Sequence, residues 1–169
     1  MNHLLFSLPL ALSLFGDYPQ RNAKYTGTDR FTEWMLLSYG KPVSVSSTDS
    51  TLIASNLSDE DIRTYWSAAT GNAGEWMMMD LGAGREVRAL QLNFYDRHTH
   101  QTNRANDTYY QYRVWASDDA QHWTLAVDKS DADRDTPHDY VELSRPLRTR
   151  YLKVENIHMP GRSNFCLSD

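Results

Sequence analysis

The most informative segment of this chain reads Asp59-Glu60-Asp61-Ile62-Arg63-Thr64-Tyr65-Trp66-Ser67-Ala68-Ala69-Thr70-Gly71-Asn72-Ala73-Gly74-Glu75-Trp76-Met77-Met78-Met79-Asp80-Leu81. An acidic loop leads to a tryptophan, a turn rich in Gly and Asn follows, and an apolar strand ends the segment. This order suits a β-sandwich with a loop held by a metal ion and other loops left to bind a ligand. The segment offers no evident nucleophile or acid–base pair, so it indicates a binding module more than an enzyme.

Short apolar runs separated by turn residues fill the chain from Lys41 onward. In residues 87–95, Leu90, Leu92 and Phe94 fall on one face, which is the period of two expected of a half-buried strand. No stretch keeps a helical period. The sequence therefore predicts an all-β fold, a jelly-roll β-sandwich. The predicted strands are Val43–Ser47, Glu75–Leu81, Val87–Tyr95, Tyr109–Ser117, Trp123–Asp128, Asp139–Leu143 and Tyr151–Asn156.

The composition narrows the classes of partner. The 169 residues suffice for one domain with a core, and 17 Lys and Arg stand against 22 Asp and Glu, a net charge of −5. With no basic run in the sequence, nucleic acid is not expected as a partner. The one cysteine, Cys166, lies between Phe165 and Leu167, so no intrachain disulfide can form and the thiol is expected to pack as a small apolar group.

The N-terminal part divides into two segments before the predicted sandwich of residues 41–169. Residues 1–16 are nearly all apolar from Leu4 to Phe15, a run too short to span a membrane. They are typical of a secretory leader, although Lys, Arg and a cleavage site are absent there, and a remnant of a preceding domain fits equally well. Residues 17–40 are interpreted as a connector from such a domain.

Several motifs, taken in order, resemble one family. The combination is similar to the discoidin domain, also called the coagulation factor 5/8 type C domain, over residues 41–169, and it implies the same all-β fold. The motifs are Lys41-Pro42-Val43-Ser44-Val45-Ser46-Ser47, Ala54-Ser55-Asn56-Leu57, Glu75-Trp76-x-x-x-Asp80-Leu81-Gly82, Tyr112-Arg113-Val114-x-x-Ser117-x-Asp119 and Arg150-Tyr151-Leu152-Lys153-Val154.

A narrower resemblance is to the discoidin-like module that follows the catalytic propeller in some bacterial family 43 glycoside hydrolases. The segments Asp61–Ala68 and Asp135–Leu143 are similar to that subgroup. This resemblance implies that the chain is the last third of a larger enzyme, that the preceding propeller is a partner, and that the protein is secreted, periplasmic or on the cell surface.

The sequence departs from the family pattern at two places. It stops at residues 165–169, where such modules continue through a final apolar strand that often supplies an oxygen near a bound ion. Glu60 stands where many discoidin domains have Gly, so the backbone angle of that turn is expected to differ.

A calcium site is the first candidate site. Calcium takes six to eight oxygens from carboxylates, carbonyls and hydroxyls, and the loop of residues 56–64 can supply most of them. The alternative is a solvated acidic loop in which Asp59 is a turn or cap residue. The resemblance implies a structural Ca²⁺, and the candidate ligands are Asn56, Asp59, Asp61 and Thr64.

A saccharide site is the second candidate site. The polar loop of residues 96–107 offers planar donors and acceptors, which suit sugar hydroxyls when an aromatic face lies nearby. The alternative is an ordinary solvated loop. Trp34 and Tyr109 are further possible platforms, whereas Trp66 and Trp76 are expected in the core. The candidate ligand-binding residues are Arg97, His98, His100, Asn103, Arg104, Asn106 and Tyr65.

Three functions compete. The first is a non-catalytic module that binds an oligo- or polysaccharide, or acts as a structural accessory, for a glycoside hydrolase acting on plant-type or host polysaccharide. The second is catalytic, through a parent family 43 xylosidase or arabinofuranosidase; the chain alone is expected to be inactive, since the propeller cannot fit in the residues before Lys41. The third is adhesion or phospholipid binding, which the net charge and the polar loop disfavour, so membrane contact is not expected.

Overall fold

The computed structural model describes residues 35–98 and 107–168, and the residues from Leu36 onward form one compact unit. Strands dominate this unit, so the predicted all-β class is confirmed. None of the helical segments in the described ranges has the length or apolarity needed to cross a bilayer. The elements are β1 (Val43–Val45), the 3₁₀ helix η1 (Ala54–Leu57), β2 (Trp66–Ser67), β3 (Trp76–Phe94), β4 (Gln111–Ser117), β5 (Thr124–Asp128), β6 (His138–His158), the 3₁₀ helix η2 (Pro160–Arg162) and β7 (Cys166–Ser168).

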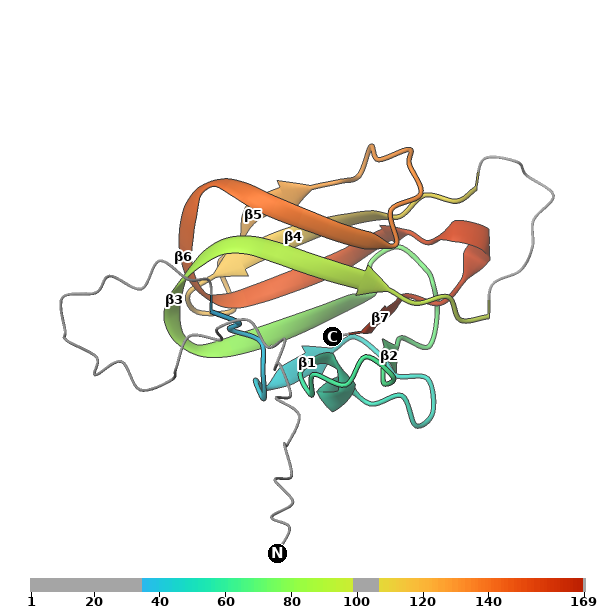
Figure 1. The fold of residues 1–169 in the computed structure, drawn as a ribbon, viewed down its shortest axis with the longest axis horizontal. Coiled ribbons are helices and arrows are strands. Elements are labelled where there is room, and N and C mark those ends of the chain that lie inside the picture. Colours follow the sequence, from blue (N-terminus) through green and yellow to red (C-terminus); the bar gives the residue numbers. More distant parts are fainter. Residues whose placement is uncertain (1–34, 99–106, 169) are drawn as a thin grey trace, which may run out of the picture. The chain divides into compact units, whose positions relative to one another are not determined.

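Two long antiparallel strands, β3 and β6, organise the sandwich. The strand order is β2-β7-β3-β6-β4-β5, with β1 also paired to β3. Figure 1 shows both long strands curving back on themselves, so that their two halves lie in facing layers. The first half of β3 pairs with β1 and with the second half of β6, which also pairs with β4; the second half of β3 pairs with β7 and with the first half of β6. This arrangement is the predicted jelly-roll β-sandwich.

The predicted strand boundaries are wrong within β3 and β6. Residues 75–81 and 87–95 were expected as separate strands, but they belong to the single strand β3; the segments 139–143 and 151–156 both lie in β6. Register shifts in the β3–β6 ladder occur after Asp80 and after Val87, and Gly82 has a φ of +80°. The glycine-containing stretch therefore bends the strand without ending it.

The short elements were not predicted. β2 and β7 contain two and three residues, too few to show a period, and η1 and η2 are single turns. β7 nevertheless joins two strands, because Leu167 is paired with Trp66 on one side and with Phe94 on the other.

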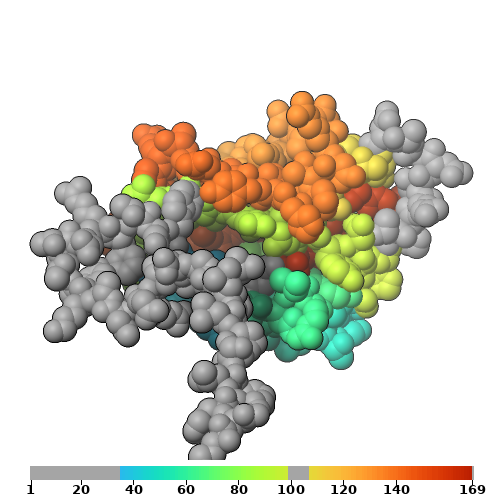
Figure 2. Space-filling model, in the orientation of Figure 1, coloured from blue at the N-terminus to red at the C-terminus, as the bar shows by residue number. Residues whose placement is uncertain are grey.

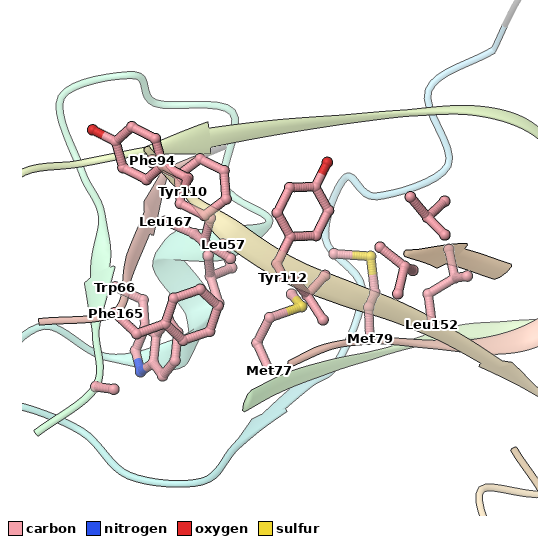
Figure 3. Packing of buried hydrophobic residues seen from close by; sticks show 14 of the residues in the cluster. Leu57, Trp66, Met77, Met79, Phe94, Tyr110, Tyr112, Leu152, Phe165 and Leu167 are labelled. Carbon is pink, nitrogen blue, oxygen red and sulfur yellow. The ribbon is translucent and has the colours of Figure 1, made fainter. Parts of the chain in front are cut away.

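The core lies between the two layers and is rich in aromatic rings (Figure 3). Trp66 and Phe165 are fully buried and meet edge to face with ring centroids 5.5 Å apart. Cys166 is also fully buried, and desolvation raises the pKa of its thiol to about 11. The expectation that Cys166 packs as an apolar side chain is confirmed, as is the core position of Trp66.

Trp76 does not share that position, so its predicted place in the core is wrong. Along the first half of β3, Met77, Met79 and Leu81 are buried, while Trp76 is only partly buried. Because side chains alternate along a strand, the buried set assigns Trp76 to the outer face of its layer. The size of the ring suggested a core residue, but the strand register decides otherwise.

Candidate functional site

The strand pairing of β3 with the β7 segment continues beyond the end of β3. The backbone N–H of Tyr95 donates to the carbonyl of Cys166 at 3.2 Å, and that of Asn164 donates to the carbonyl of Arg97 at 2.9 Å. These two bonds continue the register of the β3–β7 ladder, in which Asn93 pairs with Ser168 and Phe94 with Leu167. The backbone is therefore paired as far as Arg97, and alternation places Asn93, Tyr95 and Arg97 on one face of it.

The side chain of Arg97 meets residues from two other segments. Its Nε donates to Asp49 Oδ2 at 2.6 Å, and its Nη1 donates to the hydroxyl of Tyr65 at 3.3 Å. His98 Nε2 lies 3.4 Å from the same Asp49 oxygen. The backbone of Asp49 is fixed by its N–H, which donates to the carbonyl of Ser67 in β2. Three segments distant in sequence thus build one polar cluster.

Two tyrosine rings lie beside this cluster. Tyr65 and Tyr95 are stacked, with centroids 4.1 Å apart and an interplanar angle of 17°. Tyr95 is 46% exposed, whereas Tyr65 is partly buried. A solvent-accessible aromatic surface next to a guanidinium and a carboxylate is an arrangement that suits a polar ring-shaped ligand.

The charges in the cluster are stable at neutral pH. The hydrogen bond from Arg97 is the largest influence on Asp49 and lowers the pKa of its carboxyl. The same bond raises the pKa of the Arg97 guanidinium. Asp49 is therefore a carboxylate that only accepts hydrogen bonds, and Arg97 is a cation that only donates them.

The structure brings together Tyr65, Arg97 and His98 among the predicted ligand-binding residues. Tyr109 does not join them, since its ring stacks on His158 at 4.6 Å. Four other predicted residues and Trp34 fall outside the described residues, and their predicted roles stay predictions. Those four residues are His100, Asn103, Arg104 and Asn106.

Sequence reasoning missed Asp49 and Tyr95. Tyr95 carried a usable signal, because it lies two residues from Asn93 and two from Arg97 on a strand with a period of two. Asp49 carried none, since it lies 48 residues before the arginine that it contacts.

In the proposed calcium-binding loop, three oxygen atoms that accept hydrogen bonds lie around the hydroxyl of Thr64. Its Oγ1 lies 2.8 and 3.0 Å from the two carboxylate oxygens of Asp59 and 3.0 Å from the backbone carbonyl of Asp61. Two of these oxygens also accept backbone bonds: the carbonyl of Asp61 accepts from the N–H of Thr64 at 2.8 Å, and Asp59 Oδ1 accepts from the N–H of Asp61 at 3.0 Å. Carboxylate, carbonyl and hydroxyl oxygens are the ligand types that calcium takes.

The other two predicted metal ligands contribute less. The carboxylate of Asp61 forms a two-point ion pair with Arg63 at 2.9 Å per bond, so its backbone carbonyl alone turns to Thr64. The side-chain amide of Asn56 donates to the carbonyl of Tyr65 at 3.0 Å. Within residues 35–98 and 107–168, no three His, Cys, Asp or Glu side chains gather as a metal site. A calcium ion here would depend on Asp59 together with carbonyl and hydroxyl oxygens.

The turn in this loop keeps the left-handed backbone that a glycine favours. Glu60 has a φ of +57°, and its difference from other domains of the family at this turn stays a prediction. The left-handed conformation costs a non-glycine residue about 1–2 kcal/mol. The backbone N–H of Asp61, the residue after Glu60, donates to Oδ1 of Asp59, the residue before it, and so spans this turn.

Comparison with known families agrees with this architecture. The model of the F5/8 type C domain matches residues 42–169. The chain belongs to the F5/8 type C domain family. The resemblance inferred from the motifs is thereby confirmed at the level of the family, and the narrower likeness to family 43 modules stays a prediction. No curated protein sequence matches the chain.

Solved structures share the fold of this F5/8 type C domain at low sequence identity. Chitosan-binding module 2 of a Paenibacillus sp. IK-5 chitosanase/glucanase, solved with chitotriose, has a TM-score of 0.65 at 17% identity, covering 78% of this chain and 95% of its own. Chitosan-binding module 1 of that enzyme has a TM-score of 0.62 at 20% identity, with coverages of 78% and 92%. CpGH89CBM32-4 of Clostridium perfringens, solved with GlcNAc-α-1,4-galactose, has a TM-score of 0.62 at 15% identity, with coverages of 81% and 92%.

Proposed function

We propose that this F5/8 type C domain is a non-catalytic carbohydrate-binding module. The observation that carries the proposal is the Asp49–Arg97 pair beside the stacked rings of Tyr65 and Tyr95. Each hydroxyl of a sugar both donates and accepts a hydrogen bond, so neighbouring hydroxyls match a carboxylate and a guanidinium held side by side. The accessible face of Tyr95 suits the C–H side of the same sugar ring.

The ionisation of Asp49 supports binding rather than catalysis. Glycoside hydrolysis needs one carboxyl group that is protonated when it meets the leaving oxygen, together with a second carboxylate. Arg97 lowers the pKa of Asp49, which is the opposite of what a general acid requires. We infer that the cluster holds a saccharide and leaves its glycosidic bonds intact.

The setting of the module is also part of the proposal. The segments Asp61–Ala68 and Asp135–Leu143 support an association with a family 43 glycoside hydrolase acting on plant-type or host polysaccharide, with the catalytic propeller as partner. In that setting the protein is secreted, periplasmic or on the cell surface. A structural Ca²⁺ held by Asp59, Thr64 and the carbonyl of Asp61 would brace the loop that leads to Tyr65.

A glycan array, run with calcium and with a chelator, tests the proposal. We expect retention on a defined set of saccharides and its loss in the Asp49→Asn variant. The proposal is wrong if no glycan is retained and the chain hydrolyses an aryl xyloside or arabinofuranoside. Binding to phosphatidylserine vesicles without glycan binding would instead favour the phospholipid-binding function.

A further inference from the structure

A groove lies beside the candidate saccharide site, where the C-terminal end of β3 meets the beginning of β6 and the loop around Ile62. It is open to solvent and has a volume of about 740 Å³, within the range of small-molecule sites, and its lining includes Ile62, Gln91, Asn93, Tyr95 and His138. Figure 2 shows the yellow-green end of β3 next to the teal segment around residue 60, and residues of both segments line the groove together with Pro137 and His138. Tyr95 belongs to both places, since it lines the groove and stacks on Tyr65.

The groove and the saccharide site are joined by one row of side chains. Gln91, Asn93, Tyr95 and Arg97 are spaced by two residues, and the strand pairing is continuous through Arg97. Alternate side chains of a strand share a face, and the row extends over about 20 Å at 3.3 Å per residue. That length accommodates several sugar rings in succession.

Three planar polar side chains on the lining of the groove, those of Gln91, Asn93 and His138, contact one another. Gln91 Nε2 donates to Asn93 Oδ1 at 3.1 Å, and His138 Nδ1 lies 3.1 Å from the same oxygen. His138 and Asn93 are partners in the β3–β6 ladder, as are Tyr140 and Gln91. If His138 Nδ1 carries the proton and donates to Asn93, its Nε2 is an acceptor for a hydroxyl. Groups fixed in this way lose little conformational entropy when they bind.

Exposed apolar side chains flank these polar groups. Ile62 is 84% exposed and Tyr95 46% exposed on the lining of the groove, and Tyr140 is 57% exposed on the same strand face. Amides and an imidazole between apolar side chains suit the alternation of hydroxyl edges and C–H faces along a sugar chain.

The charge of the groove limits the class of sugar. Asp96, which accepts a bond from the Tyr110 hydroxyl at 3.1 Å, is a carboxylate on the lining, and no Lys or Arg from the described residues lines the groove. A uronate would therefore bring a negative charge next to a carboxylate without a cation to pair with it.

We propose that this groove is a second subsite, which takes the following residues of an uncharged oligosaccharide whose first sugar occupies the Asp49–Arg97 site. The inference rests on the proposed function and gives it a ligand class: an extended neutral chain rather than a lone terminal sugar. Affinity then rises with chain length, and the gain depends on Gln91 and His138.

Calorimetry with mono- to tetrasaccharides tests the inference. The probes are the gluco-, galacto-, manno-, xylo-, arabino- and N-acetylchito- series, with tetragalacturonate as the acidic arm. For each neutral series whose monosaccharide binds, we expect the tetrasaccharide to bind at least about tenfold more tightly than that monosaccharide. The double variant Gln91→Ala/His138→Ala should lose that gain and keep the affinity for the monosaccharide. The matched control, Gln121→Ala/His122→Ala in the β4–β5 turn, should retain the gain.

The outcomes separate the two proposals. Equal affinity for mono- and tetrasaccharide, or a length gain that survives in the Gln91→Ala/His138→Ala variant, overturns the second subsite and leaves the proposed function standing. Tetragalacturonate binding as tightly as the neutral tetrasaccharide overturns the neutral class. Failure of all neutral and acidic probes to bind the unaltered protein overturns the proposed function and the inference together.

Discussion

The guanidinium of Arg97 lies against the carboxylate of Asp49, with Nε 2.6 Å from Oδ2, although the two residues are 48 positions apart in the chain. The contact joins the segment after β1 to the paired strand that extends β3. Arg97 also reaches the hydroxyl of Tyr65, whose ring stacks on Tyr95. The ion pair therefore fixes both the polar and the aromatic parts of the candidate site.

Asp49→Asn should weaken saccharide binding by at least about tenfold. The amide keeps the shape of the carboxylate but loses the charge-assisted hydrogen bonds, each worth about 1.5–3 kcal/mol. Titration calorimetry on a glycan selected from the array measures the loss. Asp128→Asn is the control, because Asp128 forms a comparable pair with Arg113 at 3.3 Å in the β4–β5 ladder. Unchanged affinity in Asp49→Asn would contradict the assignment of the site.

Calcium should raise the melting temperature of the domain through Asp59. Binding to the folded state at a hundredfold excess over the dissociation constant stabilises by about 2.7 kcal/mol, which is several degrees for a domain of this size. Asp59→Asn removes the one carboxylate that faces Thr64 and should abolish the shift seen between chelator and millimolar calcium.

Asp61→Asn provides the matched comparison for the calcium prediction. Its carboxylate is committed to Arg63 and its carbonyl faces Thr64, so the amide variant keeps the relevant oxygen. We expect this variant to retain most of the thermal shift. Equal loss in both variants would mean that the carboxylate of Asp61 is a ligand as well, and absence of any shift in the unaltered domain would exclude the site.

The parts that the sequence predicted well are those with a local pattern. The period of two in residues 87–95 correctly indicated a strand, with Phe94 in the core. It did not reveal that Val87 and Leu90, three residues apart, can both face inward, because the β3–β6 ladder is irregular after Val87, where Val87 pairs with Leu147 and Ala89 pairs with Glu142. Trp76 was misplaced for a related reason, since register rather than side-chain size decides which face a residue takes.

The candidate site was predictable only in part, for a physical reason. Arg97 and His98 belong to a polar segment that is recognisable by its composition, and Tyr65 lies in the segment Asp61–Ala68, which was singled out by its resemblance to family 43 modules. Asp49 joins them through tertiary pairing, because the bond of its N–H to Ser67 sets its position beside β2. Contacts between distant segments leave no trace in a single sequence, so the partner of Arg97 emerges only from the fold.

The free energy of unfolding should fall between about pH 4 and pH 2 in part because of Asp80. Two bonds of 2.9 Å from Arg150 lower the pKa of this carboxyl to about 2 from its ordinary 3.8. Above the ordinary value the stabilisation is fully present, and it is lost as the pH falls through the lowered pKa. Since the pair is partly exposed, the contribution is about 1 kcal/mol at most. Urea unfolding at several pH values should show a shallower acid loss in Asp80→Asn than in the exposed control Asp118→Asn; identical slopes would contradict the assignment.

Gly71 should be intolerant of any side chain. A Cβ at this position would lie 1.9 Å from the carbonyl oxygen of Ser163 and 3.0 Å from its carbonyl carbon, and both are backbone atoms. The carbonyl of Gly71 also accepts a bond from the amide of Asn156 at 2.9 Å, so the turn cannot move away freely. Gly71→Ala must displace the segment before Phe165, which packs on Trp66, and should lower the free energy of unfolding by about 1–3 kcal/mol or more.

Gly84→Ala is the control for that substitution. A Cβ at Gly84 would approach only the side chain of Arg148, at 3.5 Å, which is an ordinary contact with a flexible group. Its effect on the free energy of unfolding should stay within about 0.5 kcal/mol, as for most surface changes. Urea denaturation of both variants measures the difference. If Gly71→Ala is as stable as Gly84→Ala, the turn at residue 71 does not pack against the Ser163 backbone in solution. In that case the position of Phe165 in the core beneath β2 does not depend on this turn.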